Sequence, residues 1–367
     1  MAVKSSGSPL AFSEIEAEFG QNSDRDLGEY RVSQTVGGLS NQPLDTSIPQ
    51  SGAIKFSDFY TKRLNVVIDY HSGSSENRPS DAKTRYNASA GTGTHTVIGG
   101  FATRPTDSSG TKTRIHINKI IGSATGNINN CAVRTGTGWN SGTVLTVEVG
   151  SSGAIYGAGG DGGEAGTSDG DASGDNGSSG SSGLGVQFSG TTVINNGTIS
   201  AGYGGGGGGG YRKVEREEMF SGPVYAANGG GGGGGQGLPS GEGIDGGADG
   251  TTTAGGNGGN GGESSQAHGG GGGGGGSNGE GGRGGAGTDG EGNPTDNGNN
   301  GGDGTSSSGG NGAAGTHTGS IEGENNVTST GGTGGGNGAA IRRTSGITVN
   351  ITNNATITGG TTDTGVA

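Results

Sequence analysis

The chain has 367 residues, of which 97 are glycine, 25% are hydrophobic and 4% are aromatic. The first 150 residues hold 18 glycines and a net charge of +1, whereas the following 217 hold 79 glycines and a net charge of −14. An acidic, glycine-rich surface repels phosphate groups, so we expect no nucleic-acid partner. No stretch approaches the roughly 18 apolar residues of a membrane helix, so we expect no membrane insertion either.

The first 63 residues contain a repeated phrase: Ser6–Ile15 returns as Ser51–Tyr60. Serine followed by an acid is a helix-start signal, so each copy predicts a short strand entering a helix of one or two turns. Small duplicated units with little core of their own suit docking onto another protein, although a self-contained small domain fits the spacing equally well. The candidate docking side chains are Phe12, Ile15, Phe19, Phe56, Phe59 and Tyr60.

Residues 64–150 have an all-β pattern. Strand-like runs separated by Gly, Ser, Asn and Asp turns cover Leu64–Tyr70, Thr94–Ile98, Arg114–Ile121 and Thr143–Val149. This length suits a compact β-sandwich or β-roll module.

Pure glycine runs mark the remainder, at Gly204–Gly210, Gly229–Gly235 and Gly269–Gly276. Elsewhere glycine often recurs every third residue, which matches a left-handed helix with three residues per turn and a rise of about 3.1 Å. Glycine on the inward rows would let such backbones approach and bond laterally. We therefore predict packed left-handed glycine helices. A disordered low-complexity tail is the alternative, and collagen is excluded because the whole chain has 8 prolines.

Three strand–turn–strand units accompany the glycines, at Val147–Ile155, Val193–Ile199 and Val349–Ile357. They resemble coils of a small β-roll that gives the glycine helices an apolar wall. The expected fold is mostly β plus polyglycine-II. The predicted parts are an attachment segment (1–63), a β module (64–150) and a glycine-rich binding domain (151–367).

The insert Tyr211–Asn228, between two glycine runs, is the best candidate binding site because aromatic residues and arginine are the usual interface anchors. The alternative is that its apolar residues form a local plug. Lesser candidates are the loops Leu238–Ile244, Gln266–His268 and His317–Asn326. The candidate contact residues are Tyr211, Arg212, Lys213, Arg216, Met219, Phe220, Tyr225, His268 and His317.

Signals for catalysis or cofactors are poor. The chain has no P-loop pattern and no histidine spacing typical of a metal site, so we expect neither an enzyme nor a metal or cofactor. Lone Cys131 excludes an intrachain disulfide and predicts a buried structural thiol. The start, Met1–Lys4, lacks the apolar segment of a signal peptide, so we expect synthesis and assembly inside a cell.

Two segments carry a family resemblance. Ala154–Gly163, and Val193–Gly202 leading into polyglycine, resemble the distal tail-fibre adhesins of T-even-like phages over about residues 143–360. That resemblance implies a sandwich of polyglycine-II helices whose distal loops bind host surface receptors. Phe56–Tyr60 separately looks like the N-terminal segments of tailed-phage structural proteins, cyanophage-like ones included. Residues 1–63 do not match the Trp-containing attachment region of the T-even-like tip proteins.

The resulting hypothesis is a non-enzymatic tail-fibre tip adhesin, made in the host cytoplasm and located at the distal tail fibre or tail tip of the virion. Its expected partners are a host outer-surface protein or polysaccharide and the phage tail-fibre or baseplate proteins. Alternatives are a purely structural fibre or baseplate protein, an ice-binding protein built from packed glycine helices, and a tail depolymerase. An ice-binding face would be flat and Thr- or Ala-rich, which the irregular aromatic insert disfavours.

Overall fold

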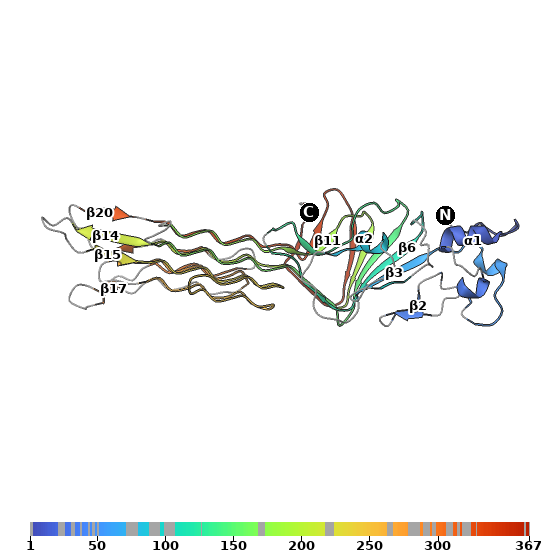
Figure 1. Cartoon of the computed structure of the whole chain (residues 1–367), viewed down its shortest axis with the longest axis horizontal. Coiled ribbons are helices and arrows are strands. Elements are labelled where there is room, and N and C mark those ends of the chain that lie inside the picture. The colour runs from blue at the N-terminus through green and yellow to red at the C-terminus, as the bar shows by residue number, and fades with distance from the viewer. Residues whose placement is uncertain are drawn as a thin grey trace.

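The computed structural model is elongated, with the helical N-terminal region at one end, three β-sheets in the middle and long glycine-rich segments running to the other end (Figure 1). It is mostly sheet with few helices and no closed barrel among the described residues. The structure describes residues 3–20, 26–30, 34–36, 39–42, 45, 48–49, 51–70, 80–87, 96–98, 107–125, 127–167, 173–216, 224–262, 267–277, 287–288, 294–295, 299–305, 311–313, 316–317, 324–327, 329–362 and 365–366.

Short helices dominate the N-terminal region. They are α1 (Phe12–Phe19), η1 (Leu27–Tyr30) and η2 (Phe56–Phe59), together with the antiparallel pair β1 (Gln34–Val36) and β2 (Leu39–Gln42). Both predicted helices are therefore confirmed.

The two helix starts of the repeated phrase have the same geometry. The Ala11 N–H donates to the Glu14 carboxylate at 2.7 Å, and the Lys55 N–H donates to the Asp58 carboxylate at 2.7 Å. The strand expected before each helix was wrong, because residues 3–11 and 51–55 contain no strand. Each extended cap residue is held by the carboxylate of its own helix rather than by a neighbouring strand.

Three sheets form the middle of the molecule. The first contains β22 (Val349–Asn353), β12 (Thr191–Asn195), β9 (Val144–Val149), β6 (Lys112–Ile117), β3 (Asn65–Tyr70) and β5 (Thr96–Ile98), in that order. The second contains β23 (Thr356–Thr358), β13 (Thr198–Ser200), β10 (Ala154–Tyr156) and β7 (Ile120–Ile121). The third contains β24 (Thr361–Thr362), β21 (Ile341–Arg343), β11 (Ser182–Val186), β8 (Cys131–Arg134) and β4 (Ser80–Asp81), with α2 (Ala82–Asn87) following β4.

Neighbouring strands in these sheets are parallel, apart from β5, which is antiparallel to β3. From β6 onward the chain visits the first, second and third sheets in turn and then begins again. We call this arrangement the winding. The predicted strand runs are present, with Arg114–Ile121 divided by a corner into β6 and β7. Each of the three sheets contains strands from before residue 150 and strands from after it.

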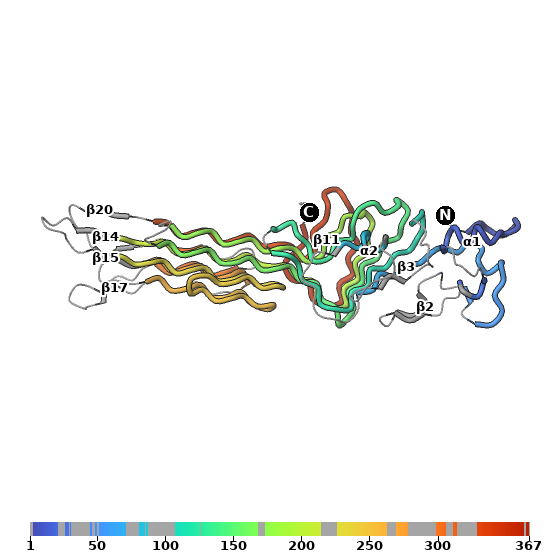
Figure 2. Tube along the Cα trace, in the orientation of Figure 1, coloured from blue at the N-terminus to red at the C-terminus, as the bar shows by residue number. Residues whose placement is uncertain are grey.

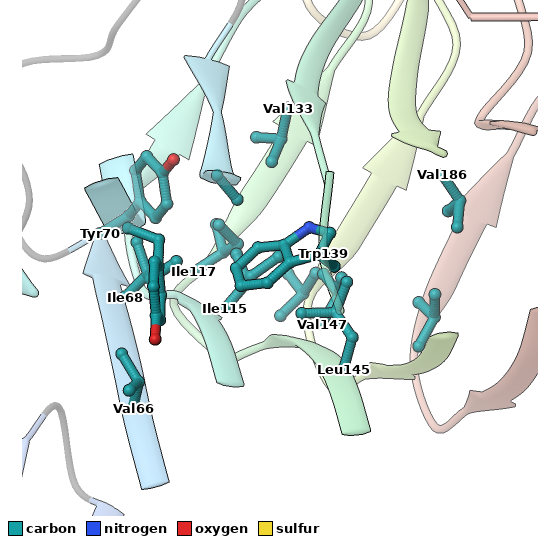
Figure 3. Packing of buried hydrophobic residues seen from close by; sticks show 14 of the residues in the cluster. Val66, Ile68, Tyr70, Ile115, Ile117, Val133, Trp139, Leu145, Val147 and Val186 are labelled. Atoms are coloured by element: carbon teal, nitrogen blue, oxygen red, sulfur yellow. The ribbon is translucent and has the colours of Figure 1, made fainter. Parts of the chain in front are cut away.

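Because the strands are parallel and in register, equivalent residues of successive turns lie one above another and form columns. One column contains Ile68, Ile115 and Val147 (Figure 3), and the register continues it to Val193; all four are fully buried. Another contains Ile121, Ile155 and Ile199, also fully buried. Each aliphatic side chain thus packs on the equivalent side chain of the next turn, and these columns form the hydrophobic core.

Cys131 is buried and free, and burial raises the pKa of its thiol to about 12, so it is a poor nucleophile. The described residues contain no group of three metal-ligating side chains. No described helix is long and apolar enough to cross a membrane.

Two long excursions leave the winding between its second and third sheets. Residues 157–181 connect β10 to β11, and residues 201–340 connect β13 to β21. Their glycine-rich segments lie side by side as long, nearly straight traces (Figure 2). We call these segments the glycine bundle.

In the glycine bundle, successive backbone N–H groups of one segment donate in turn to three neighbouring segments. The N–H groups of Gly230, Gly231 and Gly232 donate to the carbonyls of Gly270, Asp245 and Gly163, respectively. The next three residues repeat the order: Gly233, Gly234 and Gly235 donate to Gly273, Ala248 and Gly160. One segment is therefore bonded to three others with a period of three residues. These residues form an ordered structure rather than a disordered tail.

Close approach, rather than backbone conformation, requires glycine in this bundle. A Cβ added to Gly206 would overlap the carbonyl of Gly273, and one added to Gly232 would overlap the carbonyl of Gly206. Neither glycine has a φ in the left-handed region. Side chains are excluded because the backbones themselves are in contact.

Candidate functional site

The far end of the glycine bundle carries a small set of strands, which we call the tip (Figure 1). β14 (Arg212–Arg216) pairs antiparallel with both β15 (Val224–Ala227) and β20 (Glu324–Val327). β16 (Ala267–His268) pairs with β19 (Thr316–His317) and lies beside β14 and β15. Nearby at the same end are β17 (Gly287–Thr288) and β18 (Pro294–Thr295).

The chain reverses direction at the tip because its composition changes there. Gly204–Gly210 runs outward, and the Tyr-Arg-Lys-Val sequence that follows starts a strand, with β-branched or aromatic residues favouring sheet pairing. After β15 the chain returns as Gly229–Gly235. The Gly209 N–H donates to the Gly230 carbonyl at 2.7 Å, and this bond links the outgoing and returning segments below the hairpin.

The structure brings most of the predicted binding residues together at the tip. Lys213 lies opposite Ala226 and Val327, Arg216 lies opposite Glu324, and Tyr225 lies opposite Val214. His268 and His317 lie on the paired strands β16 and β19. Met219 and Phe220 lie outside the described residues.

Two of the predicted contact residues are buried at the base of the hairpin. Tyr211 is 3% exposed and Arg212 is 2% exposed. The Tyr211 carbonyl accepts a hydrogen bond from the Ser329 hydroxyl, which joins the hairpin to the segment entering from β20. Both side chains are therefore buried at the base of the hairpin, while Lys213 is half-buried.

The loop candidate Leu238–Ile244 begins at the opposite end of the bundle, beside the winding. The Leu238 N–H donates to the Gly157 carbonyl, and the Leu238 carbonyl accepts from the Ser123 N–H. Gly157 directly follows β10, so this turn sits where the bundle leaves the winding. The run Gly229–Gly235 carries the chain away from the tip, which is why the next turn is not distal.

The predicted docking residues of the N-terminal region form an aromatic cluster. Ile15, Phe19 and Phe59 are fully buried, and Phe19 and Phe59 both contact Tyr30 with ring centroids 6.2 and 6.0 Å away. These three side chains belong to the same continuous hydrophobic cluster as the side chains of β3 and β6. The outer members are Phe12 (half-buried), Phe56 (40% exposed) and Tyr60, whose hydroxyl donates to the Ser8 carbonyl at 2.7 Å.

Sequence reasoning missed Tyr30, the centre of this cluster. Leu27–Tyr30 repeats the order of an apolar residue, a small residue, an acid and an apolar residue that begins both α1 and η2. The fourth residue of each unit (Ile15, Tyr30 and Phe59) is fully buried. The recurring order of residue types was the signal that could have identified a third unit.

The described architecture is elongated: an N-terminal helical region, a β winding that shares its hydrophobic core, and a glycine bundle whose far end carries short strands. The family model described as phage tail fibre adhesin Gp38 matches residues 82–270, just over half of the chain. The chain belongs to this family of phage tail-fibre adhesins. No curated protein matches it, and no solved structure matches it.

The matched residues extend from α2 through the middle turns of the winding and the glycine runs to β16. They include the hairpin β14–β15 and leave residues 1–81 and 271–367 outside. The family is one of adhesins rather than of enzymes, and it places the protein in the virion tail, with a host receptor and tail proteins as partners.

Proposed function

We propose that this protein is a non-enzymatic tail-fibre tip adhesin that binds a host surface receptor through the tip, held out on a polyglycine-II scaffold. Membership of the tail-fibre adhesin family supports the general role. The three-neighbour rotation of hydrogen bonds in the glycine bundle supports the polyglycine-II assignment, since a helix with three residues per turn presents successive residues to three sides.

The observation that carries the proposal is the position of the tip. The segments with aromatic, basic and histidine residues, which are far apart in sequence, meet at the end of the bundle farthest from the N-terminal region. Loops on a rigid scaffold commonly carry binding function, because the scaffold already restricts their conformations and less conformational entropy is lost on binding. The receptor contacts would come from the tip loops together with Lys213, Arg216, Tyr225, His268 and His317, while Tyr211 and Arg212 keep the hairpin in place.

The N-terminal region is then the attachment end. It lies at the opposite end of the molecule from the tip, and residues 1–81 lie outside the family match. Its most exposed aromatic residue, Phe56, contacts Phe12 edge-on with ring centroids 6.0 Å apart. We propose that Phe56 and the half-buried Phe12 contact the tail-fibre or baseplate protein, while Ile15, Phe19 and Phe59 stabilise the region.

The test shortens the hairpin of the tip. Replacing residues 217–223 with Gly-Asn-Gly removes the outer part of the insert and leaves Tyr211 and Arg212 in place. We expect phage carrying this variant to assemble normally and to lose adsorption to host cells by at least tenfold. The matched control is Thr253→Lys, at an exposed turn near the winding, which should adsorb normally. Normal adsorption by the shortened variant would contradict the site assignment.

A further inference from the structure

The outer face of the first sheet carries a small cavity where β3, β6 and β9 begin. Side chains alternate along these strands, so the sequence neighbours of the core residues face outward. In register, Asn65 lies opposite Lys112, which lies opposite Val144, and Arg114 lies opposite Thr146 in the next outward row. These five residues contribute to the lining of a cavity of about 220 Å³. The cavity lies on the winding, away from the tip (Figure 1).

The cavity carries positive charge in a chain whose net charge is −13. Lys112 is exposed, and it forms no ion pair within the part of the chain that the structure describes. Arg114 is half-buried and pairs with Glu148, with a nitrogen–oxygen distance of 3.3 Å. That pair is neutral overall, so the Lys112 ammonium leaves the cavity with an excess positive charge.

The acids on this face of the sheet are already engaged. Asp69 and His116 lie opposite each other in the third outward row, both buried, with the Asp69 carboxylate 2.6 Å from the His116 Nδ1. Glu148, opposite His116, pairs with Arg114. A guanidinium has five N–H donors, so the contact with Glu148 leaves Arg114 able to bind a second acceptor. No described carboxylate lines the cavity, so an anionic ligand would not meet one there.

The size and lining of the cavity select a small ligand. Its volume falls below the roughly 300–1,000 Å³ of sites for drug-sized molecules. Ammonium and guanidinium groups bind carboxylate and phosphate through charge-assisted hydrogen bonds. The Asn65 amide and the Thr146 hydroxyl add hydrogen-bonding groups, and Val144, which is 54% exposed, adds an apolar surface. A basic end beside polar groups and a small apolar surface suits a sugar that carries a negative charge.

We propose that this cavity binds an anionic saccharide group, a carboxylate or phosphate carried on a sugar. Lys112 and Arg114 bind the anion, and Asn65 and Thr146 bind hydroxyl groups of the same sugar. The site lies on the winding and uses none of the tip residues. It is therefore a second binding site, separate from the receptor-binding tip.

Ligand-detected NMR titration of the full chain tests this site, at low ionic strength because salt screens exposed charges. The probes are glucuronic acid and glucose 6-phosphate, with neutral glucose as the matched ligand. We expect both acids to bind, and glucose to bind about tenfold more weakly, the loss expected for one charge-assisted hydrogen bond. Lys112→Gln should weaken binding of both acids by about tenfold without changing the melting temperature, and Lys112→Arg should retain binding. Lys55→Gln, at an exposed lysine of the N-terminal region, is the matched control and should bind like wild type.

Inorganic phosphate tests whether the sugar contributes to binding. Glucose 6-phosphate should bind more tightly than inorganic phosphate, and equal affinities would overturn the assignment of a saccharide ligand. Absence of binding by both acids, or binding that Lys112→Gln leaves unchanged, would overturn the site itself. None of these titrations involves the tip, so their failure is distinct from a failure of receptor binding.

Discussion

The winding and the glycine bundle belong to one chain but are held together in opposite ways. The winding buries columns of aliphatic side chains such as Ile121, Ile155 and Ile199, so its stability comes from apolar surface removed from water. The glycine bundle has few side chains to bury, and each backbone packs and bonds against several others.

Because of this difference, we expect the two parts to tolerate different substitutions. In the winding, a smaller side chain leaves a cavity, whereas at most glycines of the bundle an added side chain meets a backbone carbonyl. The winding provides fixed starting points between its second and third sheets, and the bundle extends from those points to the tip.

The largest effect is expected for an added methyl group in the bundle. Gly335→Ala puts a Cβ into the Ser178 carbonyl, while Gly336→Ala finds its nearest atoms 3.8 Å away. Because backbone cannot move aside as a side chain can, we expect Gly335→Ala to lower the free energy of unfolding by about 3 kcal/mol. Gly336→Ala should change it by less than about 0.5 kcal/mol. Thermal unfolding of both variants checks this, and equal stability would contradict the close packing.

A comparable but somewhat smaller loss is expected for cavity formation in the winding. Ile155 is fully buried between Ile121 and Ile199, so Ile155→Ala should cost about 2–3 kcal/mol of unfolding free energy. The exposed Val144 is the control, because Val144→Ala removes little buried surface. Denaturant titration measures both. A loss at Val144 as large as that at Ile155 would contradict the assignment of the core.

The smallest effect concerns acid sensitivity near α2. Burial raises the pKa of Asp107, but the Lys83 ammonium, the Asn140 N–H and the Thr143 hydroxyl outweigh burial and hold that pKa below its ordinary value. Lys83 also lies 4.3 Å from the centre of the Trp139 ring. Because the folded-state pKa is lowered, this stabilisation is present above the unfolded pKa of about 3.9 and is lost as pH falls through the folded value.

The corresponding measurement is the pH dependence of stability. Asp107→Asn should weaken the fall in melting temperature on acidification below about pH 4. Asp175→Asn, which removes an exposed carboxylate in the bundle, should keep the wild-type slope. Identical slopes for wild type and Asp107→Asn would show that this carboxylate does not contribute.

The sequence predicted the regular parts of the fold because their patterns are local. Alternating runs such as Val193–Ile199 became β12 and β13, and the pure glycine runs became hydrogen-bonded segments. It did not predict β8, β11 or β21. β11 is Ser-Gly-Leu-Gly-Val and β21 carries two arginines, so neither shows a strand pattern. Their pairing comes from the register of the surrounding turns.

The candidate site was predictable in composition but not in position. The aromatic and basic insert after Gly210 was evident, and β14 and β15 formed there. The base of the hairpin is bonded through the Tyr211 carbonyl to Ser329, which lies 118 residues away in sequence. Likewise, the position of the turn at Leu238 beside the winding follows from the direction in which Gly229–Gly235 runs, which the sequence does not reveal.

The most direct test of the account is binding of the purified, labelled full chain to host cells in competition with phage. The account predicts saturable binding that blocks phage adsorption, and loss of both when residues 217–223 are replaced with Gly-Asn-Gly. A well-folded wild-type chain that neither binds host cells nor competes with phage would contradict the adhesin account and favour a structural role in the tail.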